Sequence, residues 1–174
     1  MKLRQLTPAD ACGYRSIMLH AYASEPDAFT STVSEREPLP LSWWESRISD
    51  APGASEWVIG AFADTRLVGL AGLTLERRER TRHKATLFGT YVLPEHRGSG
   101  VGKRIVQAVL SRARSQPGLR VVQLTVTESN LGAVRLYESC GFKAFGSEPL
   151  AVCVGSRYVT KLHMWCPVAK NEGA

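Results

Sequence analysis

The stretch that decides the fold reads Arg97-Gly98-Ser99-Gly100-Val101-Gly102-Lys103. It follows a run rich in β-branched and aromatic residues (86–93) and opens a segment with apolar residues on one helical face, namely Val101, Ile105, Ala108, Val109 and Ala113. The pattern predicts a strand, a glycine-rich turn and a helix over residues 101–114. Glycines let such a turn be tight and let a ligand approach the backbone, and the free N–H groups at a helix start favour an anion. A phosphate or pyrophosphate therefore suits this turn.

Two well-known phosphate-binding loops can be tested against these residues by counting. The nucleoside triphosphate loop requires glycine where Arg97 stands and serine or threonine where Arg104 stands, so it fails at two positions. The dinucleotide fingerprint matches Gly98 and Gly100 but requires a third glycine where Lys103 stands, so it fails at one key position.

A third pattern, Arg-x-x-Gly-x-Gly, fits Arg97, Gly100 and Gly102. Further along, a second pattern (Asn-x-x-Ala-x-x-x-Tyr-x-x-x-Gly-Phe) is complete from Asn130 through Tyr137 to Phe142. In the order and spacing of these two motifs the chain resembles the GCN5-related N-acetyltransferase (GNAT) family, whose first motif is an acetyl-coenzyme A loop. Two matched motifs are far more specific than one.

The order of the expected elements supports the resemblance over nearly the whole chain. We expect strands at residues 3–6, 57–62, 67–73, 86–92, 122–127, 143–146 and 158–165. Helices are expected after Thr7, around residues 43–48 with Ser42 as the cap, at 101–114 and at 131–140, with a helical turn at 34–37. The family implies an α/β (α+β) GNAT fold, a mixed, mostly antiparallel sheet of about seven strands flanked by about four helices. Residues 1–168 should form one domain and residues 169–174 a frayed tail.

Composition is consistent with one domain and favours an acidic ligand. The chain has 174 residues, 44% of them hydrophobic, and no apolar run long enough to span a bilayer or act as a signal peptide, so the expected location is the cytoplasm, away from membranes. Its four cysteines are far apart, which indicates neither a disulfide framework nor a metal site. A net charge of +6 suits coenzyme A. Nucleic acid is the rival partner, but the densest basic segment (76–84) lacks interleaved aromatic residues and is better explained as a solvated hairpin turn.

The resemblance implies roles for particular residues. Tyr137 stands at the position of the general acid that protonates the departing thiolate, although packing of its helix on the sheet would also explain a tyrosine there. The coenzyme should contact Thr90, Tyr91 and Val92 through the strand backbone and, through the turn, Arg97, Gly98, Ser99, Gly100, Val101, Gly102 and Lys103. Gly89 is a plausible site for the strand bulge that the family has. Asn130 should bind the pantetheine arm, cap the following helix, or do both.

The general base is harder to assign. The family often places a carboxylate at positions that here hold Phe88 or Gly89 and Thr125, none of which can accept a proton. Glu128, at the expected strand end, is the nearest acid in the motif region. A water chain, an acceptor amine that is already neutral, or Glu35 or Asp27 reaching in from the first-half loop are the alternatives.

The function that the resemblance implies is transfer of an acetyl group from acetyl-coenzyme A to a primary amine, on a small molecule or a peptide N-terminus, by direct attack in a ternary complex. The alternative is a non-catalytic module that binds acyl-coenzyme A and signals its level. Acceptor choice should depend on residues 24–42, on Trp43 or Trp44, and on residues 152–158, although core packing is the more frequent fate of a tryptophan at helical spacing. Because dimers are frequent in the family, a homodimer is also an expectation.

Overall fold

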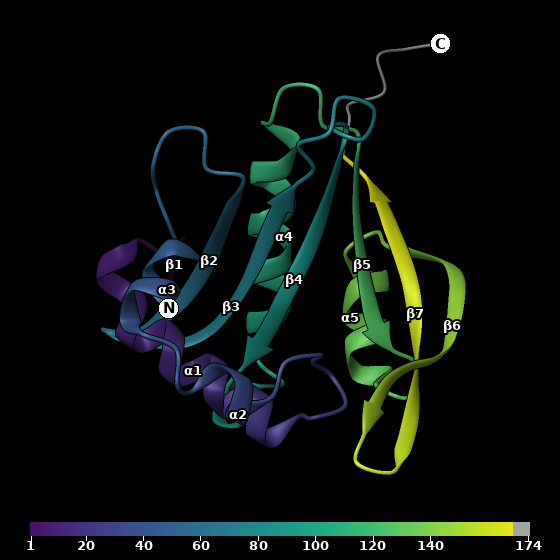
Figure 1. Ribbon diagram of the computed structural model, residues 1–174. Coiled ribbons are helices and arrows are strands. Elements are labelled where there is room, and N and C mark those ends of the chain that lie inside the picture. The colour runs from purple at the N-terminus through teal and green to yellow at the C-terminus, as the bar shows by residue number, and fades with distance from the viewer. Residues whose placement is uncertain (169–174) are drawn as a thin grey trace.

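The computed structural model describes residues 1–168 and shows a seven-stranded sheet in the order β1-β2-β3-β4-β5-β7-β6 (Figure 1). All neighbouring strands are antiparallel except β4 and β5, which are parallel, so the expected mixed and mostly antiparallel sheet is confirmed. The strands are β1 (Lys2–Gln5), β2 (Glu56–Ala63), β3 (Arg66–Leu75), β4 (Lys84–Val92), β5 (Val121–Thr127), β6 (Lys143–Val154) and β7 (Arg157–Pro167). The α-helices are α1 (Ala11–Ser24), α2 (Val33–Arg36), α3 (Leu41–Ser46), α4 (Val101–Arg114) and α5 (Leu131–Ser139), with 3₁₀ turns at Pro8–Asp10 and Pro94–His96.

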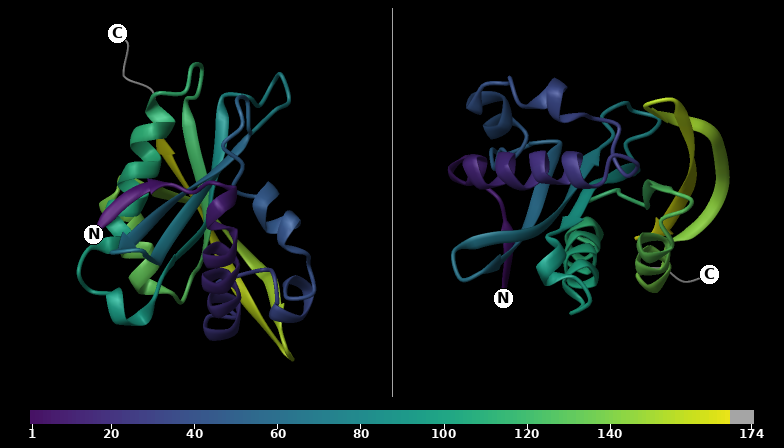
Figure 2. Two further views of the ribbon diagram at one scale, coloured as in Figure 1. Left: turned by 90° about the vertical axis from the view of Figure 1, so that its left-hand side faces the viewer. Right: turned by 90° about the horizontal axis from the view of Figure 1, so that it is seen from below.

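The helices cover both faces of the sheet, with α1, α2 and α3 on one side and α4 and α5 on the other (Figure 2). This explains why β2 and β3 are buried over nearly their whole length and do not alternate between buried and exposed residues. Helix α4 packs the apolar face that the sequence predicts, with Val101, Ile105, Val109 and Ala113 all buried. No helix in the described part of the chain combines the length and apolar character needed to cross a membrane.

The sheet divides where its two parallel strands separate. Strands β4 and β5 pair only over Lys84–Thr86 and Val121–Gln123, and beyond these three pairs they diverge (Figure 1). The register of β4 against β3 shifts at Gly89, whose φ of 64° is left-handed, so the expected bulge is confirmed. We call β1–β4 the first arm of the sheet and β5, β7 and β6 the second arm; a gap lies between them.

Several local predictions are confirmed and a few are wrong. The basic segment forms the turn between β3 and β4, and Gly141 ends α5 with a φ of 97°. Helix α3 begins at Leu41 after Pro40, whose backbone is extended, so Ser42 lies inside the helix and is not its cap. Strand β6 is longer than expected because it pairs with β7 over most of its length through two register shifts. The tail expected at residues 169–174 lies outside the described residues.

Candidate active site

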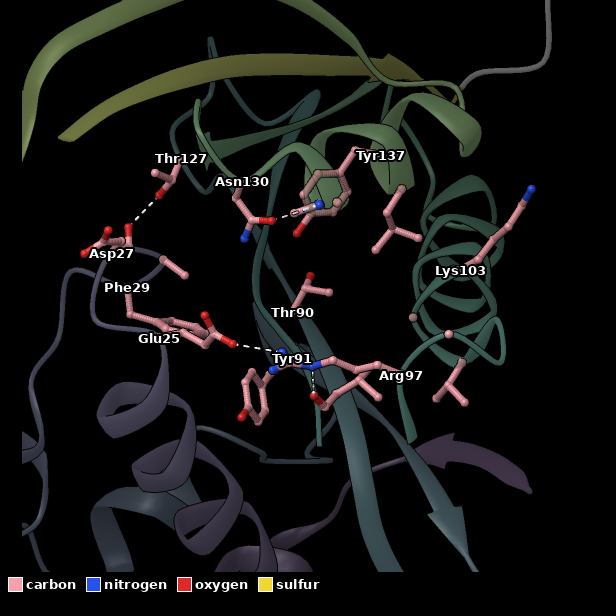
Figure 3. A pocket seen from close by; sticks show the side chains of 18 of the residues that line it. Glu25, Asp27, Phe29, Thr90, Tyr91, Arg97, Lys103, Thr127, Asn130 and Tyr137 are labelled. Carbon is pink, nitrogen blue, oxygen red and sulfur yellow. Dashed lines mark hydrogen bonds and ion pairs between the residues drawn. The ribbon is translucent and has the colours of Figure 1, made fainter. Parts of the chain in front are cut away.

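A cavity of about 640 Å³ occupies the gap between the two arms (Figure 3). Four segments line it: the α1–α2 loop, the end of β4, the turn that opens α4, and the end of β5 with one face of α5. The lining residues are Glu25, Asp27, Ala28, Phe29, Thr90, Tyr91, Val92, Arg97, Gly98, Gly100, Val101, Gly102, Lys103, Thr127, Ser129, Asn130, Gly132, Ala133, Leu136 and Tyr137. Most of the residues predicted to bind a coenzyme therefore lie together in one cavity.

The turn at residues 97–103 presents backbone to this cavity. Gly98 and Gly100 have φ values of 77° and 80°, and no side chain caps the start of α4. The N–H groups of Val101, Gly102 and Lys103 precede the first intrahelical bond, which Arg104 donates to Gly100, and so they are available to an anion. Ser99 is the exception among the predicted contacts, because its hydroxyl donates to the His96 carbonyl at 3.0 Å and it is absent from the lining.

The end of β4 presents to the gap backbone groups that pair with no neighbouring strand. Leu93 donates its N–H to Val68 of β3, so the N–H and carbonyl of Val92 point the other way, toward β5, which has already diverged. The Val92 carbonyl accepts from Nε of Arg97 at 2.9 Å. The Tyr91 side chain points away from the gap toward α1, and its hydroxyl is 2.9 Å from Nδ1 of His20.

Tyr137 is a buried phenol that lines the cavity from α5 and is only 7% exposed. It packs edge-to-face on Phe142, with ring centroids 5.8 Å apart. Burial raises the pKa of the Tyr137 phenol, which keeps it protonated and able to donate. Thr90, from the facing strand, has a buried hydroxyl with no hydrogen-bond partner among residues 1–168 (Figure 3). Asn130 caps α5, accepting from the Ala133 N–H at 3.1 Å, so the capping role expected for it is confirmed.

The carboxylates that line the cavity do not include Glu128, the first candidate for the general base. Glu128 is exposed at the end of β5 and does not line the cavity. Glu35 accepts from the Thr32 N–H at 2.9 Å as part of the α2 capping box. Asp27 and Glu25, both from the α1–α2 loop, do line the cavity, and Figure 3 shows the Glu25 carboxylate beside Arg97.

These two carboxylates have different partners. Asp27 forms an ion pair with Arg157 at 2.5 Å, and the hydrogen bond from Arg157 holds the pKa of Asp27 below its usual value. Glu25 is 2.9 Å from Nη1 of Arg97. Glu25 could not be singled out from the sequence, because its partner lies 72 positions away and no local motif marks it.

Neither tryptophan expected to shape an acceptor pocket lines the cavity. Trp44 is fully buried in the core against Tyr14, at 5.7 Å between ring centroids. Trp43 is half-buried against the edge of the core and lies beside Arg36 and Arg47. Of residues 152–158, only Arg157 reaches toward the cavity, through Asp27. The α1–α2 loop contributes an aromatic side chain to the cavity, Phe29, which packs against Tyr22 and Tyr91. We call the side of the cavity formed by this loop the acceptor side.

Within residues 1–168 no group of three or more His, Cys, Asp or Glu side chains is arranged to hold a metal ion. The site is therefore built from a backbone anion cradle, an open strand edge, a buried phenol and two loop carboxylates.

Comparison with known proteins identifies this combination of fold and cavity. Residues 18–142 match the acetyltransferase (GNAT) family, and this region holds both motifs and all the residues that line the cavity. The chain belongs to the acetyltransferase (GNAT) family. It is an acyltransferase by family, and the resemblance expected from the two motifs is confirmed.

Individual relatives differ in how much of their length the chain covers. It is 26% identical over 157 residues to the L-amino acid N-acetyltransferase AaaT of Escherichia coli (strain K12), covering 90% of this chain and 93% of that protein. It is 35% identical over 108 residues to human N-acetyltransferase 8, but spans only 45% of that protein. Among solved structures, yncA from Salmonella typhimurium, determined with its cofactor acetyl-CoA, has a TM-score of 0.81 at 22% identity, covering 100% of this chain and 97% of that one.

Proposed function

We propose that this GNAT protein transfers the acetyl group of acetyl-coenzyme A to the primary amine of a small acceptor by direct attack in a ternary complex. The observation that carries the proposal is the single cavity in which the backbone cradle, the buried Tyr137 and the Glu25 carboxylate all meet. Each of the three supplies one thing that acetyl transfer needs: an anchored thioester, a proton for the thiolate, and a proton acceptor for the amine.

The coenzyme would occupy the side of the cavity formed by α4 and β4. Its pyrophosphate suits the N–H groups of residues 101–103, where the helix dipole adds positive potential. Its pantetheine amides suit the open edge at Val92, where β5 has diverged and no strand takes those hydrogen bonds. An N–H of this bulged segment, at residues 90–92, would also donate to the carbonyl oxygen as negative charge develops on it.

Tyr137 would serve as the general acid. As the amine nitrogen bonds to the carbonyl carbon and the carbon–sulfur bond breaks, the sulfur takes a proton from the phenol to leave as the free thiol. The phenolate then recovers a proton from solvent. Because burial raises the pKa of Tyr137, the resting phenol is protonated at neutral pH, as the role requires.

Glu25 is the carboxylate that we propose accepts the proton of the amine. Asp27 is less suited, because the Arg157 guanidinium stabilises its charged form and lowers its pKa. Glu128 remains a prediction from the sequence, and its exposed position outside the cavity lining gives it no direct path to the amine. Glu25 lies on the acceptor side of the cavity, where an incoming ammonium group would meet it.

The acceptor class that we propose is free amino acids and similar small amines. AaaT, which this chain covers at 93% of its length, carries L-amino acid N-acetyltransferase in its name. The acceptor side also pairs the apolar ring of Phe29 with charged groups of both signs, which suits a molecule with an ammonium, a carboxylate and a side chain.

The test is release of free thiol from acetyl-coenzyme A across free amino acids, polyamines, aminoglycosides and N-terminal peptides, with wild type beside Tyr137→Phe. Turnover on an amino acid that falls in the variant while coenzyme affinity is kept would support the proposal. Tight coenzyme binding without turnover on any acceptor would favour the alternative, an acyl-coenzyme A sensor.

A further inference from the structure

Lys161 of β7 is the one charged side chain that is buried within residues 1–168, at 5% exposure. It forms no ion pair in this part of the chain. Its ammonium instead donates three hydrogen bonds: to the carbonyls of Asp27 and Ala28, at 3.1 and 3.0 Å, and to the Thr127 hydroxyl at 2.8 Å. Removing an ammonium from water is costly, so a site that holds one needs full hydrogen bonding of this kind.

Two of these three hydrogen bonds hold one short segment of backbone, and the third joins Lys161 to Thr127, which holds the same segment. Thr127 and Lys161 are directly opposite each other on β5 and β7, and the Thr127 hydroxyl donates to the same Asp27 carbonyl at 2.5 Å. Two consecutive carbonyls of the α1–α2 loop are therefore fixed to the second arm of the sheet. We call residues 25–29 the acceptor loop.

The other end of the acceptor loop is fixed to the first arm. Glu25 pairs with Arg97, and the same guanidinium donates to the Val92 carbonyl at the end of β4. The acceptor loop thus bridges the two diverging arms across the acceptor side of the cavity, as Figure 3 shows for Glu25 and Asp27. Its position, and that of Phe29 within it, depends on attachments to both arms.

We propose that Lys161 is a positioning residue, which holds the acceptor loop across the gap so that the site accepts small free amines and disfavours polypeptide N-termini. The proposal rests on the proposed function and adds to it the residue that sets acceptor size. On this proposal an extended peptide would have to pass where the acceptor loop lies, whereas a free amino acid would fit into the cavity behind it. Because Lys161 holds backbone carbonyls, the loop keeps its place whatever its side chains bind.

Two variants remove the hydrogen bonds that hold the acceptor loop, by different means. Lys161→Met keeps the length of the side chain and removes its charge and its three hydrogen bonds. Thr127→Val removes the hydroxyl that both donates to Asp27 and accepts from Lys161, and Thr127→Ser restores it. Lys143→Met, at an exposed position of β6, is the matched control for loss of a lysine.

Hydrogen exchange at the Ala28 amide, whose N–H donates to the Glu25 carbonyl at 2.9 Å, reads the order of the loop directly and needs no acceptor. We expect exchange to be at least about tenfold faster in Lys161→Met and Thr127→Val, and to match wild type in Thr127→Ser and Lys143→Met. Unchanged exchange in both Lys161→Met and Thr127→Val overturns the proposal. If Lys161→Met fails to fold, the Val and Ser variants of Thr127 give the same answer.

Steady-state kinetics then test the selectivity. In Lys161→Met and Thr127→Val we expect KM for a small amine to rise about tenfold and KM for acetyl-coenzyme A to stay within about twofold. The ratio of kcat/KM for a small amine to kcat/KM for a peptide should fall about tenfold. Equal changes in both KM values, or an unchanged preference, would show a general effect on the fold and refute the positioning role. Absence of turnover in wild type would refute the proposed function, while the exchange data would still decide whether Lys161 holds the loop.

Discussion

The two sides of the cavity are formed in different ways, one by backbone groups and the other by a loop that side chains hold in place. On the coenzyme side, residues 97–103 and the end of β4 present N–H and carbonyl groups, placed by two left-handed glycines and a bulge. On the acceptor side, residues 25–29 are held by side chains from distant parts of the chain, Arg97 at 72 positions and Lys161 at 134 positions from their partners. The first side is therefore set by local backbone geometry and the second by long-range contacts.

This difference teaches where each property of the enzyme can change. Backbone donors tolerate side-chain substitution, so a common ligand can be kept while the rest of the sequence varies. A loop held by a few side chains can be moved by changing one of them. The predictions below test this contrast, beginning with the residue that lies between the two sides.

Tyr137→Phe should have the largest effect, because it removes the proton donor for the departing thiolate, on which transfer between the two sides depends. We expect kcat to fall about 100-fold, within the range for loss of a general acid, with the Kd for acetyl-coenzyme A changed less than about twofold. Stopped thiol-release assays and calorimetry would measure the two quantities. A variant that keeps wild-type turnover would leave Tyr137 with a packing role only.

Glu25→Gln should come next and should act on the acceptor side alone. Loss of the proton acceptor is expected to lower kcat/KM for the amine by at least about tenfold, with little change in coenzyme affinity. Asp27→Asn is the matched control, because it neutralises the other carboxylate of the loop, which lines the same cavity and is also paired with an arginine. If the two variants lose activity equally, Glu25 is not the distinct base and both carboxylates act only through the electrostatic field.

Gly100→Ala should weaken the coenzyme side by straining its backbone. A left-handed φ costs a non-glycine residue about 1 kcal/mol, so both the free energy of unfolding and the coenzyme affinity should fall, the latter about tenfold. Gly118→Ala is the control: Gly118 has a similar φ of 77°, open space around it, and a place outside the cavity lining. Gly118→Ala should lose similar stability and no coenzyme affinity. An equal loss of affinity in both variants would contradict the proposal that the backbone of residues 97–103 binds the coenzyme.

The smallest effect on catalysis should come from an ion pair remote from both sides. Arg4 makes two hydrogen bonds to Asp10, at 2.7 and 2.6 Å, and these hold the pKa of Asp10 below its usual value. The folded pKa is lower than the unfolded one, so the pair stabilises the fold above the unfolded pKa, and this contribution is lost as pH falls through the folded pKa. Given the partial exposure of Arg4, we expect Arg4→Met to cost about 1 kcal/mol at neutral pH.

Urea unfolding at neutral and acidic pH would measure this contribution in wild type and Arg4→Met. The difference between the two proteins should shrink at low pH, while both KM values stay at their wild-type levels. A shift in either KM would mean that stability and site geometry are more strongly coupled than the structure indicates.

The same contrast explains what could be predicted from the sequence. The turn at residues 97–103, the bulge at Gly89 and the cap at Asn130 depend on residues close in sequence, and each was predicted and found. Trp44 lies in the core, the more frequent fate of a tryptophan at helical spacing, and the pocket role also considered for Trp43 or Trp44 is wrong because spacing alone does not say which face of α3 meets the core. Lys161 reads as an ordinary strand residue, since only the return of β7 beside β5 brings it to the acceptor loop.

The short junction between β4 and β5 also has a mechanical consequence. The strands nearest the two ends of the chain, β1 and β7, belong to different arms, and only three residue pairs join those arms within the sheet. Tension applied through the ends would therefore load this seam, together with the acceptor loop that crosses it. If acetyl-coenzyme A binds in the gap as proposed, it contacts both arms across the same seam, and its binding should raise the force needed to separate them.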